Sequence, residues 1–279
     1  MLRFRQAFHL IDGLWLLGRH LHSLTALPKP EALNHFIPLP AKPSHGVRNP
    51  RYPDVKAPLV VFDLDGTMID THADLIESLN HTITSAGLEP VTYDDLTHLV
   101  GQGARVMIRR AFDLKNTPLS EDDLEPLFDR FIAHYKAGMP GKSHAYPGLT
   151  ECFDRLQAAG MTIAVCTNKQ ETLALPLLEG LGLTRYFVAI TGGDTFEFRK
   201  PDARHIFGTI EKAGGDPARS VMIGDSVNDI LAAHNANVPS VGVSFGYSDV
   251  PVAELNPTAI IDGFDELTPE MVLQLIEKK

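Results

Sequence analysis

The chain has 279 residues, of which 44% are hydrophobic, which is enough for one large domain with an insertion or for two domains. Residues 1–57 hold eight of the 25 Lys/Arg but only three of the 35 Asp/Glu, so the remainder is strongly acidic, which argues against nucleic acid as a partner. The two cysteines, Cys152 and Cys166, form no CxxC pair and are interpreted as reduced structural thiols.

The first 57 residues differ in composition from the rest. Eight of the 20 prolines lie from Pro28 to Pro58, a density that disfavours helices and central strands. The apolar residues 14–17 suggest a signal peptide, but Asp12 and Arg19 interrupt the pattern, and nothing here is long enough to span a bilayer. We predict a basic, Pro-rich extension over 1–57, interpreted as a poorly ordered tail with a targeting or docking arm as the alternative, and a cytoplasmic protein without membrane association.

Beyond residue 57, short apolar runs alternate with helical patterns. The runs have the length and β-branched content of buried parallel strands and cover 58–63, 161–167, 186–190, 220–225 and 238–243. Helix-length segments lie between them at 148–160, 170–180, 202–213 and 226–236. The alternation predicts an α/β fold with a doubly wound, mostly parallel sheet. Ligands of such sheets bind at the carboxyl ends of the strands, where Asp63, Thr167 and Asp225 lie.

The long interval between the first two strands shows no strand pattern. Its apolar residues have helical spacing over 72–86, 103–112 and 120–136. We therefore predict an all-helical cap over 72–144, inserted into a catalytic core formed by 58–71 and 145–279. Its attachment directly after the first strand would let it close over the site as a lid.

Two carboxylates follow the first strand, two residues apart. Asp63 is placed where a carboxylate can attack phosphorus and form an acyl phosphate. Asp65 can protonate the leaving oxygen as a general acid and then activate water as a general base. Gly66 permits a tight turn, and Thr67 offers a hydroxyl and an N–H to a phosphate.

Further polar residues follow the later strands. Thr167 and Asn168 are candidate donors to phosphoryl oxygens, and Lys200 supplies a fixed positive charge. Asp225 and Asp229 lie four residues apart, on one face of a helical turn. Carboxylates around a phosphate would repel it unless a cation lay between them, and hard oxygen ligands indicate Mg²⁺.

These elements together resemble the haloacid dehalogenase superfamily. Its phosphatases carry DxDGT after a hydrophobic strand, a later strand ending in Thr or Ser, a Lys before a helix, and a GDxxxD element. The corresponding stretches here are VVFDLDGT (60–67), VCTN (165–168), FRKPD (198–202) and IGDSVND (223–229). The resemblance covers about residues 58–262 and implies the strand order 5-4-1-2-3. It also implies Mg²⁺ held by Asp63, the backbone carbonyl of Asp65, and Asp225, with Asp229 in support.

Within the superfamily, the presence of Asp65 disfavours dehalogenation, because dehalogenases lack the second Asp. The helical insertion and the segments 100–112 and 145–156 are similar to the phosphoglycolate phosphatase-like group. That similarity implies Mg²⁺-dependent hydrolysis of a small phosphate ester through an aspartyl phosphate, with 2-phosphoglycolate as the leading substrate. The alternatives are a sugar or amino-sugar phosphate such as N-acetylmuramic acid 6-phosphate, pyrophosphate, a β-phosphoglucomutase-like phosphomutase, or a non-catalytic binding module.

A small substrate that carries a carboxylate needs a cation on the cap. Arg105, Arg109 and Arg110 follow the loop Gly101–Gly103 and are the candidates. We interpret Arg109 and Arg110 as part of a solvated helix face and retain Arg105 as a binding residue. The partner predicted for the whole protein is a small phosphate ester, and the protein itself is expected to be a monomer or a homodimer.

Overall fold

The computed structural model describes residues 55–92, 94–95, 103–248 and 250–278. Nearly all of the predicted extension (1–57) and the loop residues Gly101 and Gln102 lie outside the described residues. Within the described part of the chain, no helix combines the length and the apolar character needed to cross a membrane. Cys152 and Cys166 are both buried and free, in agreement with their interpretation as reduced thiols.

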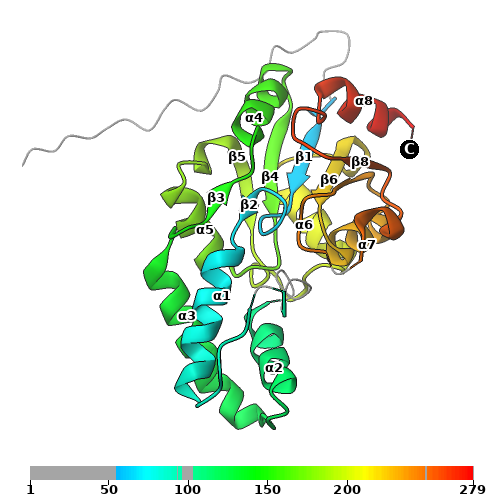
Figure 1. Cartoon of the computed structure of the whole chain (residues 1–279). Helices are drawn as coiled ribbons and strands as arrows, with labels where there is room; N and C mark the ends of the chain where they lie inside the picture. Colours follow the sequence, from blue (N-terminus) through cyan, green and yellow to red (C-terminus); the bar gives the residue numbers. More distant parts are fainter. Residues whose placement is uncertain (1–54, 93, 96–102, 249, 279) are drawn as a thin grey trace, which may run out of the picture. The chain divides into compact units, whose positions relative to one another are not determined.

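A six-stranded parallel sheet forms the core (Figure 1). The order is β5-β4-β1-β6-β7-β8, so the five predicted strands take the predicted order 5-4-1-2-3 and a sixth follows at one edge. The sixth strand was not predicted, because it has three residues and a single partner strand. The strands are β1 (Leu59–Phe62), β4 (Thr162–Cys166), β5 (Phe187–Thr191), β6 (Ser220–Gly224), β7 (Ser240–Val243) and β8 (Ala259–Ile261).

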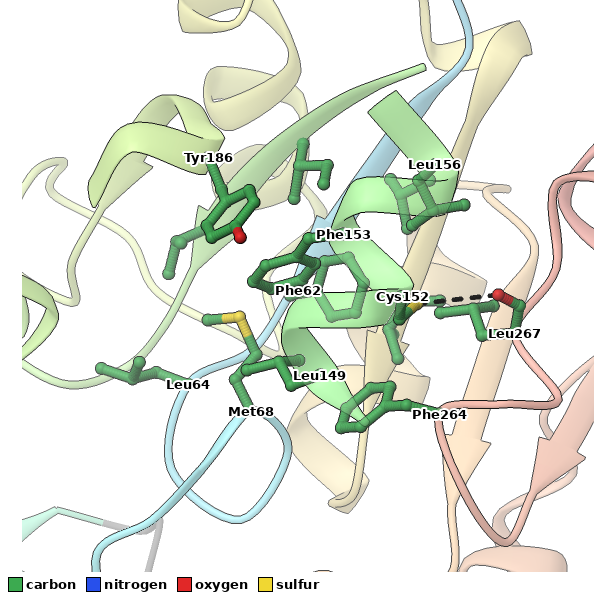
Figure 2. Close-up of a cluster of buried hydrophobic side chains, with 14 of the residues drawn as sticks. Phe62, Leu64, Met68, Leu149, Cys152, Phe153, Leu156, Tyr186, Phe264 and Leu267 are labelled. Atoms are coloured by element: carbon green, nitrogen blue, oxygen red, sulfur yellow. Dashed lines mark hydrogen bonds between the residues drawn. The ribbon is translucent and has the colours of Figure 1, made fainter. Parts of the chain in front are cut away.

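Both faces of the sheet are buried, which is why its strands are apolar at successive positions. Val60 and Phe62 point into one cluster with the helices α4 (Leu149–Ala158), α5 (Glu171–Gly180) and α8 (Pro269–Glu277). Leu59 and Val61 point into the other, with α6 (Ala203–Lys212) and α7 (Val227–Asn235). Figure 2 shows the first cluster, in which the rings of Phe62 and Phe153 meet edge to face at a centroid distance of 5.2 Å. This packing fixes the sheet and therefore the positions of its strand ends.

A helical insertion follows the first strand, as predicted. It leaves the core through the short strand β2 (Ile69–Asp70) and returns through β3 (His144–Ala145), which pairs antiparallel with β2. The helices between them, which we call the cap, are α1 (His72–Ser85), α2 (Ala104–Leu114) and α3 (Glu121–Gly138). Their apolar stripes meet in a separate cluster that includes Leu79, Met107 and Phe131. Leu173 and Tyr247, from outside the cap, also belong to this cluster, so it packs the cap helices against one another and against the core. Two adjacent short strands connect the cap to the core.

Short 3-10 turns complete the core at Thr184–Tyr186, Pro217–Arg219 and Val252–Leu255. Side-chain caps fix the starts of several helices: Ser120 accepts from the N–H of Asp123 before α3, and Asp202 accepts from the N–H of Arg204 before α6. The hydrogen bond of Asp202 also matters for the site, because it fixes the start of α6 directly after the loop that carries Lys200.

Candidate active site

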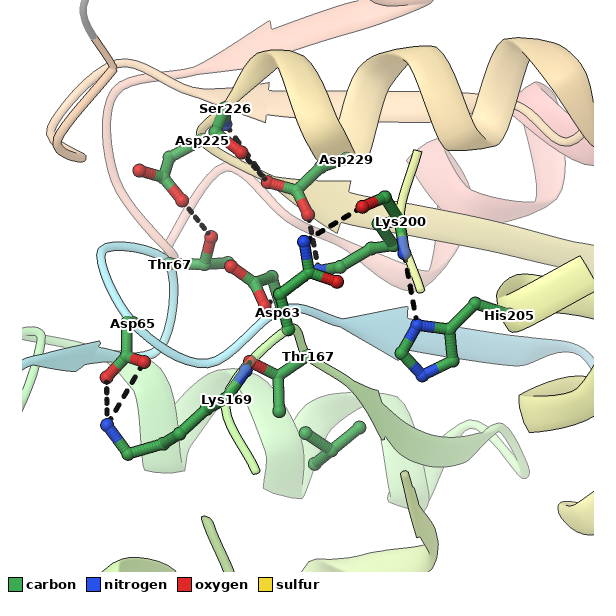
Figure 3. A network of polar contacts seen from close by, with 12 residues as sticks. Asp63, Asp65, Thr67, Thr167, Lys169, Lys200, His205, Asp225, Ser226 and Asp229 are labelled. Atoms are coloured by element: carbon green, nitrogen blue, oxygen red, sulfur yellow. Dashed lines mark hydrogen bonds and ion pairs between the residues drawn. The ribbon is translucent and has the colours of Figure 1, made fainter. Parts of the chain in front are cut away.

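The carboxyl ends of three neighbouring strands meet at one edge of the sheet. Asp63 follows β1, Thr167 follows β4, and Asp225 follows β6, and these strands are adjacent in the order β4-β1-β6. The N–H of Asp63 donates to the carbonyl of Ile223 at 2.9 Å, which ties the first strand end to the third. The three polar side chains that the sequence placed at strand ends therefore lie together (Figure 3).

A buried lysine links two of the carboxylates. Lys200 Nζ donates to Asp63 Oδ1 at 2.7 Å and to Asp229 Oδ1 at 2.5 Å, and only 2% of Lys200 is exposed. Burial alone would lower the pKa of Lys200, but the Asp229 and Asp63 carboxylates raise it above its usual range. Lys200 is therefore a permanent cation between these two aspartates.

Asp229 connects Lys200 to the start of helix α7. It is fully buried, and its Oδ2 accepts from the backbone N–H and the hydroxyl of Ser226, which forms a capping box at the start of α7. Its other oxygen accepts from Lys200, so both oxygens have protein donors. The i+4 spacing of Asp225 and Asp229 thus brings them to one side, as expected, and gives Asp229 a supporting position.

Asp225 is held by two donors from separate loops. The Thr67 hydroxyl donates to its Oδ1 and the Tyr247 N–H donates to its Oδ2, each at 2.8 Å. Burial is the largest cause of a raised pKa at Asp225, about 8, and the Asp229 carboxylate adds to it. Gly66 has φ +81°, and a Cβ there would lie 2.5 Å from Asp225 Oδ2. Gly66 is therefore required by the close approach of the DxDGT turn to Asp225.

Asp63, Asp225 and Asp229 form a group whose residues suit a metal ion. Each offers a carboxylate oxygen, and these oxygens all lie within 4.8 Å of one another. Among the described residues, the Lys200 ammonium pairs with Asp63 and Asp229, and the third carboxylate, that of Asp225, accepts hydrogen bonds from neutral donors only. Carboxylate oxygens are the ligands that hard divalent cations prefer. A divalent cation fits this site by both charge and ligand type.

Asp65 belongs to a second polar group beside the first. It accepts a hydrogen bond from the Thr71 hydroxyl at 2.7 Å, and Lys169 Nζ lies 3.0 and 3.2 Å from its two oxygens. The same ammonium lies 2.9 Å from the hydroxyl of Tyr135, on cap helix α3. Burial is the largest single influence on the pKa of Lys169 and lowers it, but the Asp65 carboxylate and the Tyr135 hydroxyl together outweigh burial, so the net shift is upward. Lys169 was not singled out from the sequence, although its place two residues after the end of the predicted strand 161–167 was a usable signal.

Thr167 and Asn168 lie between these two groups. The Thr167 N–H continues the sheet by donating to the carbonyl of Thr191, and its hydroxyl accepts from the Lys169 N–H at 3.2 Å. The Asn168 side-chain amide donates to the carbonyl of Lys200 at 2.9 Å. Asn168 therefore stabilises the loop that carries Lys200, and Thr167 lines the small recess around Asp63.

A cavity of about 170 Å³ opens between the cap and the core next to this site. Arg105 lines it, as the sequence predicted for a cap cation, but both terminal nitrogens of its guanidinium pair with the Glu125 carboxylate. Arg109 pairs with the exposed Glu121. Asp65 and Lys169 lie in the cavity wall on the core side. The buried charged groups at this cavity are thus Asp65 and Lys169 of the core, whereas Arg105 of the cap is exposed.

The fold and the site together define an α/β protein with a parallel sheet, a helical cap and a centre of aspartates and a lysine at the carboxyl ends of its strands. The model of the haloacid dehalogenase-like hydrolase family matches residues 60–243. The chain belongs to this family, which confirms the resemblance drawn from its motifs.

Individual relatives place the chain within the family. It is 68% identical over 222 residues to a phosphoglycolate phosphatase of Agrobacterium fabrum, covering 80% of this chain and 95% of that protein. It is 48% identical over 219 residues to a phosphoglycolate phosphatase of Mesorhizobium japonicum, covering 78% and 96%. Its fold is similar to the crystal structure of a predicted phosphoglycolate phosphatase from Haemophilus somnus, with a TM-score of 0.71, 30% identity and coverage of 76% and 96%.

Proposed function

We propose that the protein is a phosphatase that hydrolyses 2-phosphoglycolate with the help of Mg²⁺. The observation that carries the proposal is the 68% identity to a phosphoglycolate phosphatase, which covers 95% of that protein. In this chain, Asp63, Asp65 and Lys200 lie together at the carboxyl ends of the strands. A non-catalytic binding module would have no need for this combination. The same site residues would also suit a phosphatase of sugar or amino-sugar phosphates, but the relatives named above are phosphoglycolate phosphatases.

In the proposed mechanism, Asp63 attacks the phosphorus and forms an aspartyl phosphate. Lys200, hydrogen-bonded to Asp63, orients the nucleophile and offsets the charge of the phosphoryl oxygens. The side chain of Thr167 and the N–H groups of the turn at Thr67 are proposed to bind those oxygens. Asp65 protonates the departing alkoxide and then deprotonates the water that attacks the phosphoenzyme.

The proposed metal is Mg²⁺, held by the carboxylates of Asp63 and Asp225 and the backbone carbonyl of Asp65. Bound there, it would neutralise phosphate charge in the same way as Lys200 does. Asp229 would keep Lys200 and the start of α7 in place, which is the supporting role that its two occupied oxygens suit. The cap, residues 72–144, is proposed to limit the access of water to the cavity.

The test is a screen for phosphate release with and without Mg²⁺. The substrates compared are 2-phosphoglycolate, hexose phosphates, N-acetylmuramic acid 6-phosphate and pyrophosphate, with product analysis for isomerised sugar phosphates. We expect the highest kcat/KM for 2-phosphoglycolate and no turnover without a divalent cation. A clear preference for another ester would refute the substrate, isomerised product would indicate a mutase, and full activity in the presence of a chelator would refute the metal.

Asp225 and Asp229 should differ in their effect on the metal requirement. Asp225→Ala removes a proposed ligand and should raise the half-saturating Mg²⁺ concentration by more than about 100-fold. Asp229→Asn should raise it by about 10-fold, because its new amide hydrogens would face either Lys200 or Ser226, both donors. The measurement is a Mg²⁺ titration of phosphatase activity, with circular dichroism to verify folding. Identical titrations for the wild type and Asp225→Ala would show that Asp225 is not a ligand.

Mg²⁺ should stabilise the protein more at pH 8 than at pH 5. Burial, followed by the Asp229 charge, raises the pKa of Asp63 from 3.8 to about 6 and that of Asp225 to about 8. Between pH 4 and pH 8 the metal-free folded state therefore holds protons that the unfolded state has released, and its stability falls as the pH rises. The cation competes with fewer protons at the upper end of this range.

The measurement is the melting temperature with and without Mg²⁺ at both pH values. Asp225→Ala is the control, and it should lose most of the Mg²⁺-dependent increase at pH 8. An increase of the same size at pH 5 and pH 8 would contradict the expected competition between protons and metal.

A further inference from the structure

The acidic site continues directly into the cavity under the cap. Asp65, Asn168 and Lys169 line both the small recess around Asp63 and the cavity of about 170 Å³. Beyond these residues the wall consists mainly of apolar side chains from the cap and from α5, among them Leu75, Met107, Phe131 and Leu173. A phosphate bound beside Asp63 would therefore extend its organic part toward Lys169 and then meet an apolar wall.

Among the described residues, three cationic side chains line this cavity, and they differ in how strongly they can bind an anion. Both terminal nitrogens of Arg105 are paired with Glu125, and its guanidinium stacks over the Phe128 ring at 3.9 Å. Arg199 is exposed, so water screens its charge. Only 5% of the Lys169 side chain is exposed. Like Arg105, Lys169 is paired with a carboxylate, that of Asp65, so the difference between the three lies in burial. Because electrostatic attraction is strongest where water is excluded, the Lys169 ammonium attracts an anion more strongly than the two exposed guanidinium groups do.

The hydrogen bonds of Lys169 show which donor a ligand can take over. An ammonium has three N–H groups. They donate to the two oxygens of the Asp65 carboxylate, at 3.0 and 3.2 Å, and to the Tyr135 hydroxyl at 2.9 Å. The bond of 3.2 Å is the longest of the three and duplicates a contact with the same carboxylate, so its N–H is the one that can turn to a ligand. Among the described residues, no further acceptor lies within hydrogen-bond distance of this ammonium. Asp65 belongs to the core and Tyr135 to the cap, so these two partners hold the ammonium at the junction of recess and cavity. Figure 3 shows its contact with Asp65.

We propose that Lys169 forms a carboxylate subsite and selects short phosphorylated acids over neutral phosphate esters, an inference that rests on the proposed function. In such an ester the carboxyl carbon is only two bonds from the ester oxygen, which Asp65 would protonate. Lys169 Nζ lies 3.0 Å from Asp65, so a carboxylate so close to the ester oxygen comes within its reach. The several hydroxyls of a hexose phosphate would instead face a wall in which apolar side chains such as Leu75, Phe131 and Leu173 outnumber the polar ones, and each hydroxyl left without a partner there would cost binding energy. Lys169, not Arg105, is thus the specificity-determining cation.

The experiment compares two esters that differ only in the charged group. The kcat/KM for 2-phosphoglycolate is divided by that for 2-hydroxyethyl phosphate, in which a hydroxymethyl group replaces the carboxylate. Lys169→Met should reduce this ratio by about 10- to 100-fold, the effect of one hydrogen bond to a charged group, mainly through a higher KM for 2-phosphoglycolate. Arg105→Met and Arg199→Met, which remove the other two cations of the cavity, should leave the ratio within about threefold.

The outcomes separate this subsite from the proposed function. The wild type alone tests the function, because a wild type without preference for 2-phosphoglycolate refutes both the substrate and the subsite. With that preference present, an equal loss for both esters in Lys169→Met would show that the lysine acts only on Asp65 or the cap. A collapse of the ratio in Arg199→Met or Arg105→Met would place the carboxylate elsewhere. If Lys169→Met fails to fold, Lys169→Gln, which retains a donor to Asp65, is read in the same way.

Discussion

Replacement of Asp63 by Asn is expected to abolish the turnover of every phosphate ester. An amide does not attack phosphorus, and it lacks the negative charge that the divalent cation requires, so we expect kcat/KM to fall by at least about 10⁴-fold. The loss should be of similar size for 2-phosphoglycolate and for p-nitrophenyl phosphate, because Asp63 is the group that accepts the phosphoryl group whichever leaving group departs. Steady-state kinetics with both esters provides the measurement.

The fold of Asp63→Asn should survive. The amide has the same shape, and its oxygen can still accept the hydrogen bond from Lys200. The matched control is Asp129→Asn, the same chemical change at an exposed position of α3, which should retain wild-type activity. Rapid quenching of the wild type during turnover should give protein with the added mass of one phosphoryl group, and Asp63→Asn should show none. A phosphorylated Asp63→Asn protein would place the nucleophile elsewhere.

The sheet could be predicted from the sequence because its strands are buried on both faces. Continuous apolar runs such as Leu59–Phe62 and Ser220–Gly224 have few other interpretations when helices lie between them. Strands with less burial leave weaker patterns. β8 has three residues and pairs only with β7, while β2 and β3 have two residues each and depend on one another. These elements follow from tertiary contacts rather than from local periodicity.

The centre of the site could be predicted for a related reason. Parallel strands present their carboxyl ends at one edge, so residues that follow adjacent strands must converge, as Asp63, Thr167 and Asp225 do. The surroundings of a long side chain could not be predicted in this way. Lys169 is buried because Tyr135, 34 residues earlier on the cap, packs against it. Arg105 is paired because Glu125, 20 residues later on another helix, lies beside it. Neither partner is visible in the spacing of any motif.

The arrangement around Asp65 explains why the chain carries a second carboxylate two residues after the first. Asp63 is hydrogen-bonded to Lys200 in the recess, whereas Asp65 lies at the entrance to the cavity, with Thr71 and Lys169 as its donors. The two side chains therefore have different surroundings, one suited to the phosphorus and the other to the ester oxygen. A substitution at Asp65 should accordingly change the reaction in a way that depends on the leaving group.

Asp65→Asn is expected to separate the two halves of the reaction. An alkyl ester such as 2-phosphoglycolate needs a proton on its leaving oxygen, and its kcat/KM should fall by about 10²- to 10⁴-fold. The p-nitrophenolate ion leaves without a proton, so transfer of the phosphoryl group to Asp63 should survive in part. Water attack on the phosphoenzyme should then be slow, because the base is missing. Stopped-flow absorbance should show a burst of nitrophenol that approaches one equivalent of enzyme, followed by a slow steady rate.

The trapped intermediate distinguishes a lost proton donor from a distorted site. In Asp65→Asn, mass spectrometry after the burst should find one phosphoryl group on Asp63, whereas Asp63→Asn under the same conditions gives neither burst nor added mass. The asparagine keeps the shape of Asp65 and can still accept from the Thr71 hydroxyl, so the turn that positions Asp63 should persist. If Asp65→Asn instead slows the aryl and the alkyl ester by the same factor, without a burst and without a phosphorylated protein, then Asp65 does not transfer the proton. Its contacts with Thr71 and Lys169 would in that case serve only to position the turn.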